Sequence, residues 1–261
     1  ADEHKGTPAE VWLRHGQSTA AFTPSEGCWC TAFRIARDGK WFSILAEPPS
    51  WEALRTRPTM YGNPLLFPYP YGVRDGTFEY RGQVYHLPPG RELGRAVHGV
   101  VRDHAWTVER MWEDGDGAHL EALFRHEGEL LAEYPFPFLM AATHTLAGGT
   151  LTDHWRVTNL GDGPMPMGLG IHPYFGLPLF AGGRVSDLRM QSDVGNLRPF
   201  DLARMQGGKG EWPCVPAEGA LDMRPGQRVD EYLNAAAPAE RSVLVLYSQH
   251  GAEAVAPGEG W

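Results

Sequence analysis

The chain has 261 residues, of which 42% are hydrophobic and 21% are charged. This composition is ordinary for a folded protein that buries a core, and it argues against disorder over most of the length. The formal net charge of −9 argues against nucleic acid as a partner, because phosphate contacts need clustered lysine and arginine.

Short strand-like runs recur along the chain between its 32 glycines and 22 prolines. A short helix is predicted at about residues 49–57, where Pro58 ends it. Asp75-Gly76 and Arg81-Gly82 flank one strand-like run, which predicts a hairpin. Many short strands bounded by turn residues predict an all-β sandwich or barrel. The clearest strand-like runs are 11–13, 77–80, 105–108 and 242–247.

No fixed-period repeat and no linker divides the chain, so we expect a single domain over residues 1–261. The stretch 201–219 is predicted to be a surface loop. An apolar run of about 18 residues and a signal peptide are both lacking, which favours a cytoplasmic protein without a membrane partner. Cys28, Cys30 and Cys214 give no disulfide framework and are expected to be reduced thiols.

Motifs for metal, nucleotide and serine-nucleophile chemistry are missing. The sequence has no HExxH, no GxxxxGK[ST] and no GxSxG, and its histidines lack paired ligand spacing. Acid–base chemistry by histidine and carboxylates remains.

Two of the 11 histidines stand out by their surroundings. His98 precedes Gly99 near the start of a predicted strand, and His172 follows a glycine-rich run. Pro173 restricts His172 to an extended backbone. Tyr174 and the phenylalanine after it could form a platform for a sugar, or they could be core aromatics at the end of a strand.

Several segments, in order, resemble the aldose 1-epimerase family between about residues 60 and 235. The most specific is Gly168-Leu169-Gly170-Ile171-His172-Pro173-Tyr174-Phe175. The others are Gly62-Asn63-Pro64-Leu65-Leu66-Phe67-Pro68, residues 73–78, His98-Gly99-Val100-Val101-Arg102 with Trp106, Tyr134-Pro135-Phe136-Pro137-Phe138, residues 151–166 and Val229-Asp230-Glu231.

The resemblance implies a large antiparallel β-sandwich of the galactose-mutarotase-like kind, with an open sugar-binding cleft. It also implies interconversion of the α and β anomers of free aldoses, such as galactose or glucose, without a cofactor. By position, His172 would be the general acid to the ring oxygen and His98 a second imidazole that holds the sugar. Asp230 would accept hydrogen bonds from sugar hydroxyls. An imidazole with an unperturbed pKa of about 6.5 can give and retake a proton near neutral pH.

Two positions depart from the family pattern. Where the family has Asn-Arg after its Phe-Pro segment, this chain has Tyr71-Gly72, and Arg74 either substitutes in sugar binding or lies on a solvated hairpin. The family's general base is a glutamate in a Glu-Pro-Trp setting, which Glu259-Gly260-Trp261 resembles. Glu259 is therefore either the base, on a strand that is cut off at residue 261, or a residue of the family's final turn.

These residues are compatible with three hypotheses about function. The first is a mutarotase of free hexoses, acting as a monomer or homodimer. The second is a hexose-6-phosphate 1-epimerase, which would need an arginine cluster for the phosphate. The third is a carbohydrate-binding protein on the same fold, in which the base is lost and catalysis is impaired.

Overall fold

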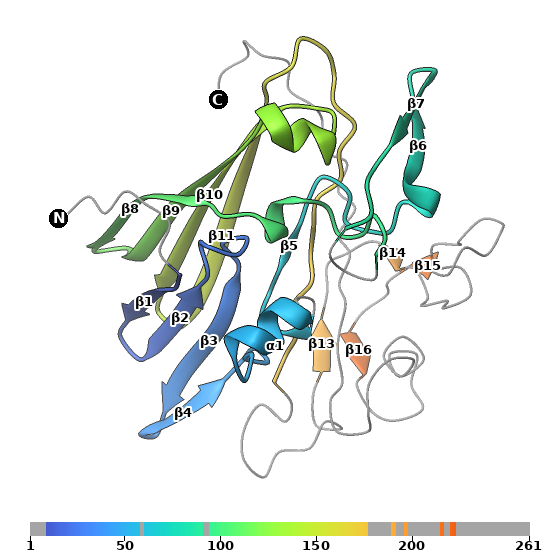
Figure 1. Cartoon of the computed structure of the whole chain (residues 1–261). Coiled ribbons are helices and arrows are strands. Elements are labelled where there is room, and N and C mark those ends of the chain that lie inside the picture. Colours follow the sequence, from blue (N-terminus) through green and yellow to red (C-terminus); the bar gives the residue numbers. More distant parts are fainter. Residues whose placement is uncertain are drawn as a thin grey trace.

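Two four-stranded antiparallel sheets dominate the computed structural model of the chain (Figure 1). The structure describes residues 9–57, 60–90 and 94–176, together with four short strands further on. In the first sheet the strands are β1 (Val11–His15), β2 (Ser18–Phe22), β3 (Cys30–Arg37) and β4 (Lys40–Ser43). In the second they are β8 (Thr107–Asp114), β9 (Gly117–His126), β10 (Phe138–Ala147) and β11 (Thr150–Asn159).

Smaller elements complete the described part of the chain. The helical ones are α1 (Trp51–Thr56) and the 3₁₀ turns η2 (Arg74–Gly76), η3 (Val101–Asp103) and η4 (Gly128–Ala132). The short strands are β5 (Leu65–Leu66), β6 (Thr77–Tyr80), β7 (Gln83–His86), β12 (Gly170–Ile171), β13 (Arg189–Gln191), β14 (Asn196–Leu197), β15 (Val215–Pro216) and β16 (Ala220–Asp222).

The two large sheets pack through their apolar faces, with β1 against β9 and β10, and β2 against β10. Because side chains alternate between the faces of a strand, β10 buries every second residue from Phe138 to Leu146. The apolar ones among them share one core with Phe22 and Leu120. The all-β expectation is confirmed. No helix among the described residues is long and apolar enough to cross a bilayer.

The predicted helix and hairpin are both present. The Ser50 hydroxyl accepts a hydrogen bond from the Ala53 amide at 3.1 Å and caps α1. β6 and β7 form the hairpin, and its turn residues Arg81 and Gly82 have left-handed φ of 52° and 77°. The hairpin extends away from the two sheets (Figure 1). The predicted strand at 242–247 lies outside the described residues.

Residues 62–68, which we call the central segment, connect the distant parts of the fold. Along one edge, the segment pairs with β12 and the residues around it. The carbonyls of Gly62, Pro64 and Pro68 accept hydrogen bonds of 2.8, 3.1 and 2.7 Å from Tyr174, His172 and Gly168.

The other edge of the central segment uses the residues in between. Asn63 donates its amide hydrogen to the Cys30 carbonyl at 2.7 Å, and Phe67 accepts from the Val100 amide at 2.8 Å. Successive strand residues direct their backbone groups to opposite edges. One extended segment therefore joins β3, the stretch after β12 and the stretch before η3.

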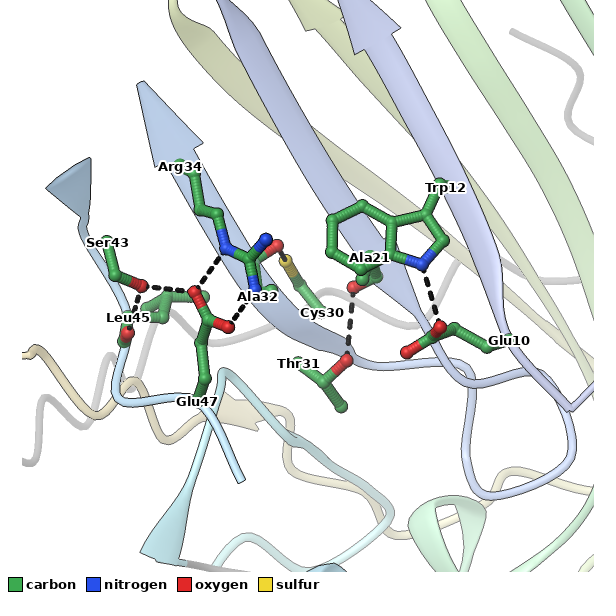
Figure 2. Close-up of polar contacts among 10 residues, drawn as sticks. All are labelled: Glu10, Trp12, Ala21, Cys30, Thr31, Ala32, Arg34, Ser43, Leu45 and Glu47. Atoms are coloured by element: carbon green, nitrogen blue, oxygen red, sulfur yellow. Dashed lines mark hydrogen bonds and ion pairs between the residues drawn. The ribbon is translucent and has the colours of Figure 1, made fainter. Parts of the chain in front are cut away.

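Glu47 joins β3 to the chain that follows β4 (Figure 2). Arg34 donates from Nε to Glu47 Oε1 at 2.6 Å and makes a second contact from Nη2 to Oε2. The Ser43 hydroxyl also donates to Oε1. Burial by itself would raise the pKa of the Glu47 carboxyl, but these hydrogen bonds outweigh it and hold the pKa below its ordinary value.

The ion pair lies next to the segment that carries His172. Ala46 donates its amide hydrogen to the Tyr174 carbonyl at 2.7 Å, and Leu45 forms a β-bridge with Phe175. The chain from Leu45 to Glu47 thus covers the free edge of the stretch after β12.

We expect Glu47→Gln to lower the free energy of unfolding by about 1 kcal/mol at neutral pH. Hydrogen bonds to charged groups contribute about 1.5–3 kcal/mol, and solvent screens this pair because the Arg34 and Glu47 side chains are 39% and 26% exposed. Since the folded-state pKa is lowered, the ionised carboxylate stabilises the fold above its unfolded pKa of about 4.3, and this contribution is lost as the pH falls through the folded pKa.

Urea unfolding of both proteins across the acid range measures this effect. The difference between wild type and Glu47→Gln should shrink toward zero in acid. Glu79→Gln, at an exposed position on β6, is the matched control and should change little at any pH. A decrease in the unfolding free energy of Glu47→Gln that is the same at every pH would contradict the interpretation.

Candidate functional site

His172 lies immediately after β12 and is held along its backbone. Its amide donates to the Pro64 carbonyl at 3.1 Å, and Pro173 keeps it extended. The side chain is 5% exposed. The Tyr174 ring stacks on the imidazole, with centroids 4.8 Å apart and an interplanar angle of 19°. Tyr174 is itself only 6% exposed, so the stack limits the imidazole to a small number of orientations.

His98 approaches from the opposite edge of the central segment. It is half-buried and takes a left-handed φ of 64°, followed by Gly99 at 74°. Gly99 forms a parallel β-bridge with Phe67. A Cβ atom at Gly99 would lie 2.0 Å from the Phe67 carbonyl oxygen, so only glycine fits this approach.

The two edges bring the predicted histidines together. The ring centroids of His98 and His172 are 5.5 Å apart and the rings meet edge to face at 65°. One imidazole is buried and the other half-buried. The structure thus places two imidazoles from distant parts of the sequence side by side.

The stretch after His98 is fixed at several points. Trp106 donates from Nε1 to the Val101 carbonyl at 2.9 Å, and its amide donates to the Pro24 carbonyl at 2.7 Å. The Arg102 side chain is fully buried, and Gly27 lies so close that a Cβ there would be 2.5 Å from the Arg102 backbone. η3 is therefore a rigid continuation of the His98 turn.

The remaining predicted residues fall in different places. Arg74 is exposed on η2, at the base of the hairpin. The preceding Val73 donates its amide hydrogen to the Ala96 carbonyl at 2.8 Å, which connects this stretch to the residues leading to His98. Asp230 and Glu259 lie outside the described residues.

Tyr174 lies against His172, and its contact with a sugar stays a prediction. Its ring is buried and one face is occupied by the His172 imidazole. Sequence reasoning did not identify this support, nor the contact of Gly99 with Phe67. The His-Pro-Tyr and His-Gly spacings were visible, but the contacts depend on strand pairing between distant segments.

Cys30 adjoins the site through the central segment, and both Cys28 and Cys30 are free, buried thiols. Burial raises the pKa of both thiols, and the negative charge of Asp153 adds to the effect. Because the thiolate is the reactive form, neither is suited to act as a nucleophile. Cys30 contributes to the site through its backbone, since its carbonyl accepts the hydrogen bond from Asn63.

An open hollow of about 460 Å³ lies on the sheet of β8 to β11, away from these residues. Its charged rim includes the ion pair of Arg110 and Glu121, with 2.6 Å between Nε and Oε2. None of the predicted site residues lines it.

Comparison with known proteins identifies relatives of this chain. The family model for aldose 1-epimerase matches residues 10–193. A relative from Lactococcus lactis subsp. lactis, the plasmid protein LacX, is 28% identical over 156 residues, covering 59% of this chain and 47% of LacX. The uncharacterized protein YihR of Escherichia coli K12 is 29% identical over 114 residues, covering 42% of this chain and 34% of YihR. The chain spans about half the length, or less, of these curated relatives.

Solved structures show the same fold. A galactose mutarotase-like protein from Clostridium acetobutylicum superposes with a TM-score of 0.67 and 23% identity, covering 88% of this chain and 68% of that one. A galactose 1-epimerase from Lactobacillus acidophilus gives a TM-score of 0.60 and 18% identity, covering 90% and 69%. The predicted galactose-mutarotase-like sandwich is confirmed.

We expect Cys28 and Cys30 to resist alkylation by iodoacetamide in the native protein. Both thiols are buried and their raised pKa leaves almost no thiolate. In the urea-unfolded chain, where a thiol has a pKa of about 8.5, both should react readily. Peptide mass mapping before and after unfolding measures the difference, and labelling of either residue in the folded protein would contradict it.

Proposed function

The chain belongs to the aldose 1-epimerase family, and on that premise we propose that it interconverts the α and β anomers of a free hexose such as galactose or glucose. The observation that supports this most directly is the convergence of His98 and His172, with ring centroids 5.5 Å apart. The two residues come from separate segments that the central segment aligns.

In the proposed reaction the sugar ring opens and closes by proton transfer. A base removes the proton of the anomeric hydroxyl while His172, as the imidazolium, protonates the ring oxygen. The C1–C2 bond of the open aldehyde rotates, and the ring closes on the other face as the two protons return. Positioned acid–base groups typically contribute about 10²–10⁴-fold each to the rate.

The contacts around His172 suit a proton donor that must be held in place. A buried imidazole meets few competing water molecules, and the Tyr174 stack keeps it aimed in one direction. We assign Tyr174 to supporting this ring beside the substrate. His98, which is half-buried, would hydrogen-bond the sugar from the more open side.

Three further residues complete the proposed site, and two of them, Asp230 and Glu259, lie outside the described part of the chain. Glu259 is the proposed base, since a carboxylate is ionised at neutral pH and burial strengthens it as a base. Asp230 is proposed to accept hydrogen bonds from sugar hydroxyls. Arg74 is the proposed cationic contact at the base of the hairpin, and cytoplasm is the proposed place of action.

The hexose-6-phosphate epimerase hypothesis and the sugar-binding hypothesis predict different results in a mutarotation assay. A hexose 6-phosphate substrate would need free cations at the site, and Arg102 cannot serve because its side chain is buried. Arg81 is engaged elsewhere: its guanidinium carbon lies 5.7 Å from the centroid of the Tyr80 ring, at the tip of the hairpin. Polarimetric mutarotation of α-galactose, α-glucose and glucose 6-phosphate distinguishes the substrates. A protein that binds galactose without accelerating mutarotation would be a sugar binder and would contradict the enzyme proposal.

We expect His172→Asn to lower the rate of mutarotation by at least about 10²-fold, because it removes the proton donor. His154→Asn, at an exposed position on β11, is the control and should leave the rate unchanged. Polarimetry at saturating galactose measures both. A nearly unchanged rate in His172→Asn would remove this residue from the mechanism.

We expect Glu259→Gln to lower the rate of mutarotation by at least about 10²-fold, because the substitution removes the proposed general base. The amide keeps the shape of the side chain and loses its basicity, so KM should change less than kcat. A rate equal to that of the wild type would instead support the final-turn reading of this residue.

A further inference from the structure

We propose that Gly99, seated against the Phe67 carbonyl, is a positioning residue that sets the separation of the two imidazoles. The inference rests on the proposed function, because it concerns how the same site is held. It adds a residue that makes no contact with substrate and acts through His98.

The contact at Gly99 leaves no room for a side chain. A Cβ atom there would lie 2.0 Å from the Phe67 oxygen, 2.3 Å from its carbonyl carbon and 2.8 Å from its nitrogen. The same oxygen accepts hydrogen bonds from the amides of Val100 at 2.8 Å and Val101 at 3.4 Å. The turn that carries His98 is therefore pressed onto one carbonyl of the central segment.

The conformation of His98 depends on this contact. The left-handed region is unfavourable for a non-glycine residue, and His98 adopts it with a φ of 64°. The hydrogen bonds to Phe67 hold the chain in this turn. A shift of the turn would therefore move the His98 ring directly.

The central segment fixes the other imidazole as well. Pro64 accepts from the His172 amide at 3.1 Å on one edge, and Phe67 accepts from Val100 on the other. These two anchors are three residues apart, or about 10 Å along an extended strand at about 3.3 Å per residue. From these two points the rings converge to 5.5 Å, so the segment acts as a fixed spacer.

The test is Gly99→Ala, with Gly94→Ala as the matched control. Both glycines are left-handed, at 74° and 59°, but Gly94 has no atom within 4 Å of an added Cβ. Alanine at position 99 must move the turn by about 1 Å or more, and a 1 Å misplacement can cost about 10²-fold in rate. We expect a loss of about 10–10²-fold in kcat for Gly99→Ala and less than about twofold for Gly94→Ala.

A double-mutant cycle with His98→Ala separates positioning from general damage. If Gly99 acts through the His98 ring, Gly99→Ala should cost less than about twofold once that ring is gone, because coupled residues are not additive. Full additivity of the two losses would overturn the proposal.

A second measurement does not need catalysis. The NMR resonances of the His172 ring sense the neighbouring His98 ring, so His98→Ala and Gly99→Ala should both shift them, and Gly94→Ala should not. This result holds even if the wild type shows no mutarotation, which would overturn the proposed function alone. Unshifted His172 resonances in a folded Gly99→Ala protein would overturn the positioning role.

A third measurement uses the wild type, in case Gly99→Ala does not fold. The Val100 amide should exchange with deuterium as slowly as the amides inside β9 and β10, because its hydrogen bond to Phe67 anchors the turn. Exchange at the rate of an exposed loop would contradict the anchor.

Discussion

Backbone hydrogen bonding along both edges of residues 62–68 is the constraint on which the rest of the site depends. A strand in the middle of a sheet satisfies its polar backbone groups on two sides, and here the two sides belong to segments far apart in sequence. Cys30 and Val100 lie on one edge, and Gly168, His172 and Tyr174 lie on the other. The stretches that carry the two imidazoles are both hydrogen-bonded to this backbone. The distance between the two rings therefore depends more on strand pairing than on side-chain packing.

The flanking segments are braced in turn by side chains. The Arg34–Glu47 pair holds the chain that covers the outer edge near Tyr174, and Trp106 holds the chain that follows His98. One brace is a charge-assisted contact at half-buried positions, and the other is a buried aromatic ring. They respond differently to conditions, since acid weakens the first and leaves the second intact.

Local patterns in the sequence predicted local structure well. The helix near residues 49–57, the hairpin at Arg81-Gly82 and the all-β class all follow from turn residues and short apolar runs, whose physics acts within a few positions. The choice of His98 and His172 needed the family resemblance, because neither motif is distinctive alone. The burial of Tyr174 and the Phe67–Gly99 contact could not be predicted, since they arise from the register between strands separated by long loops. The partners proposed at Asp230 and Glu259 stay predictions.

The left-handed turn at His98 also shapes how this site can change over evolution. Most residues would strain the backbone there, whereas asparagine and aspartate, besides glycine, adopt such a φ with less cost. A mutational path that replaces this imidazole therefore runs through a few short polar residues or requires the turn to be rebuilt. The backbone of the turn therefore limits which side chains position 98 can accept, independently of the chemistry proposed for it.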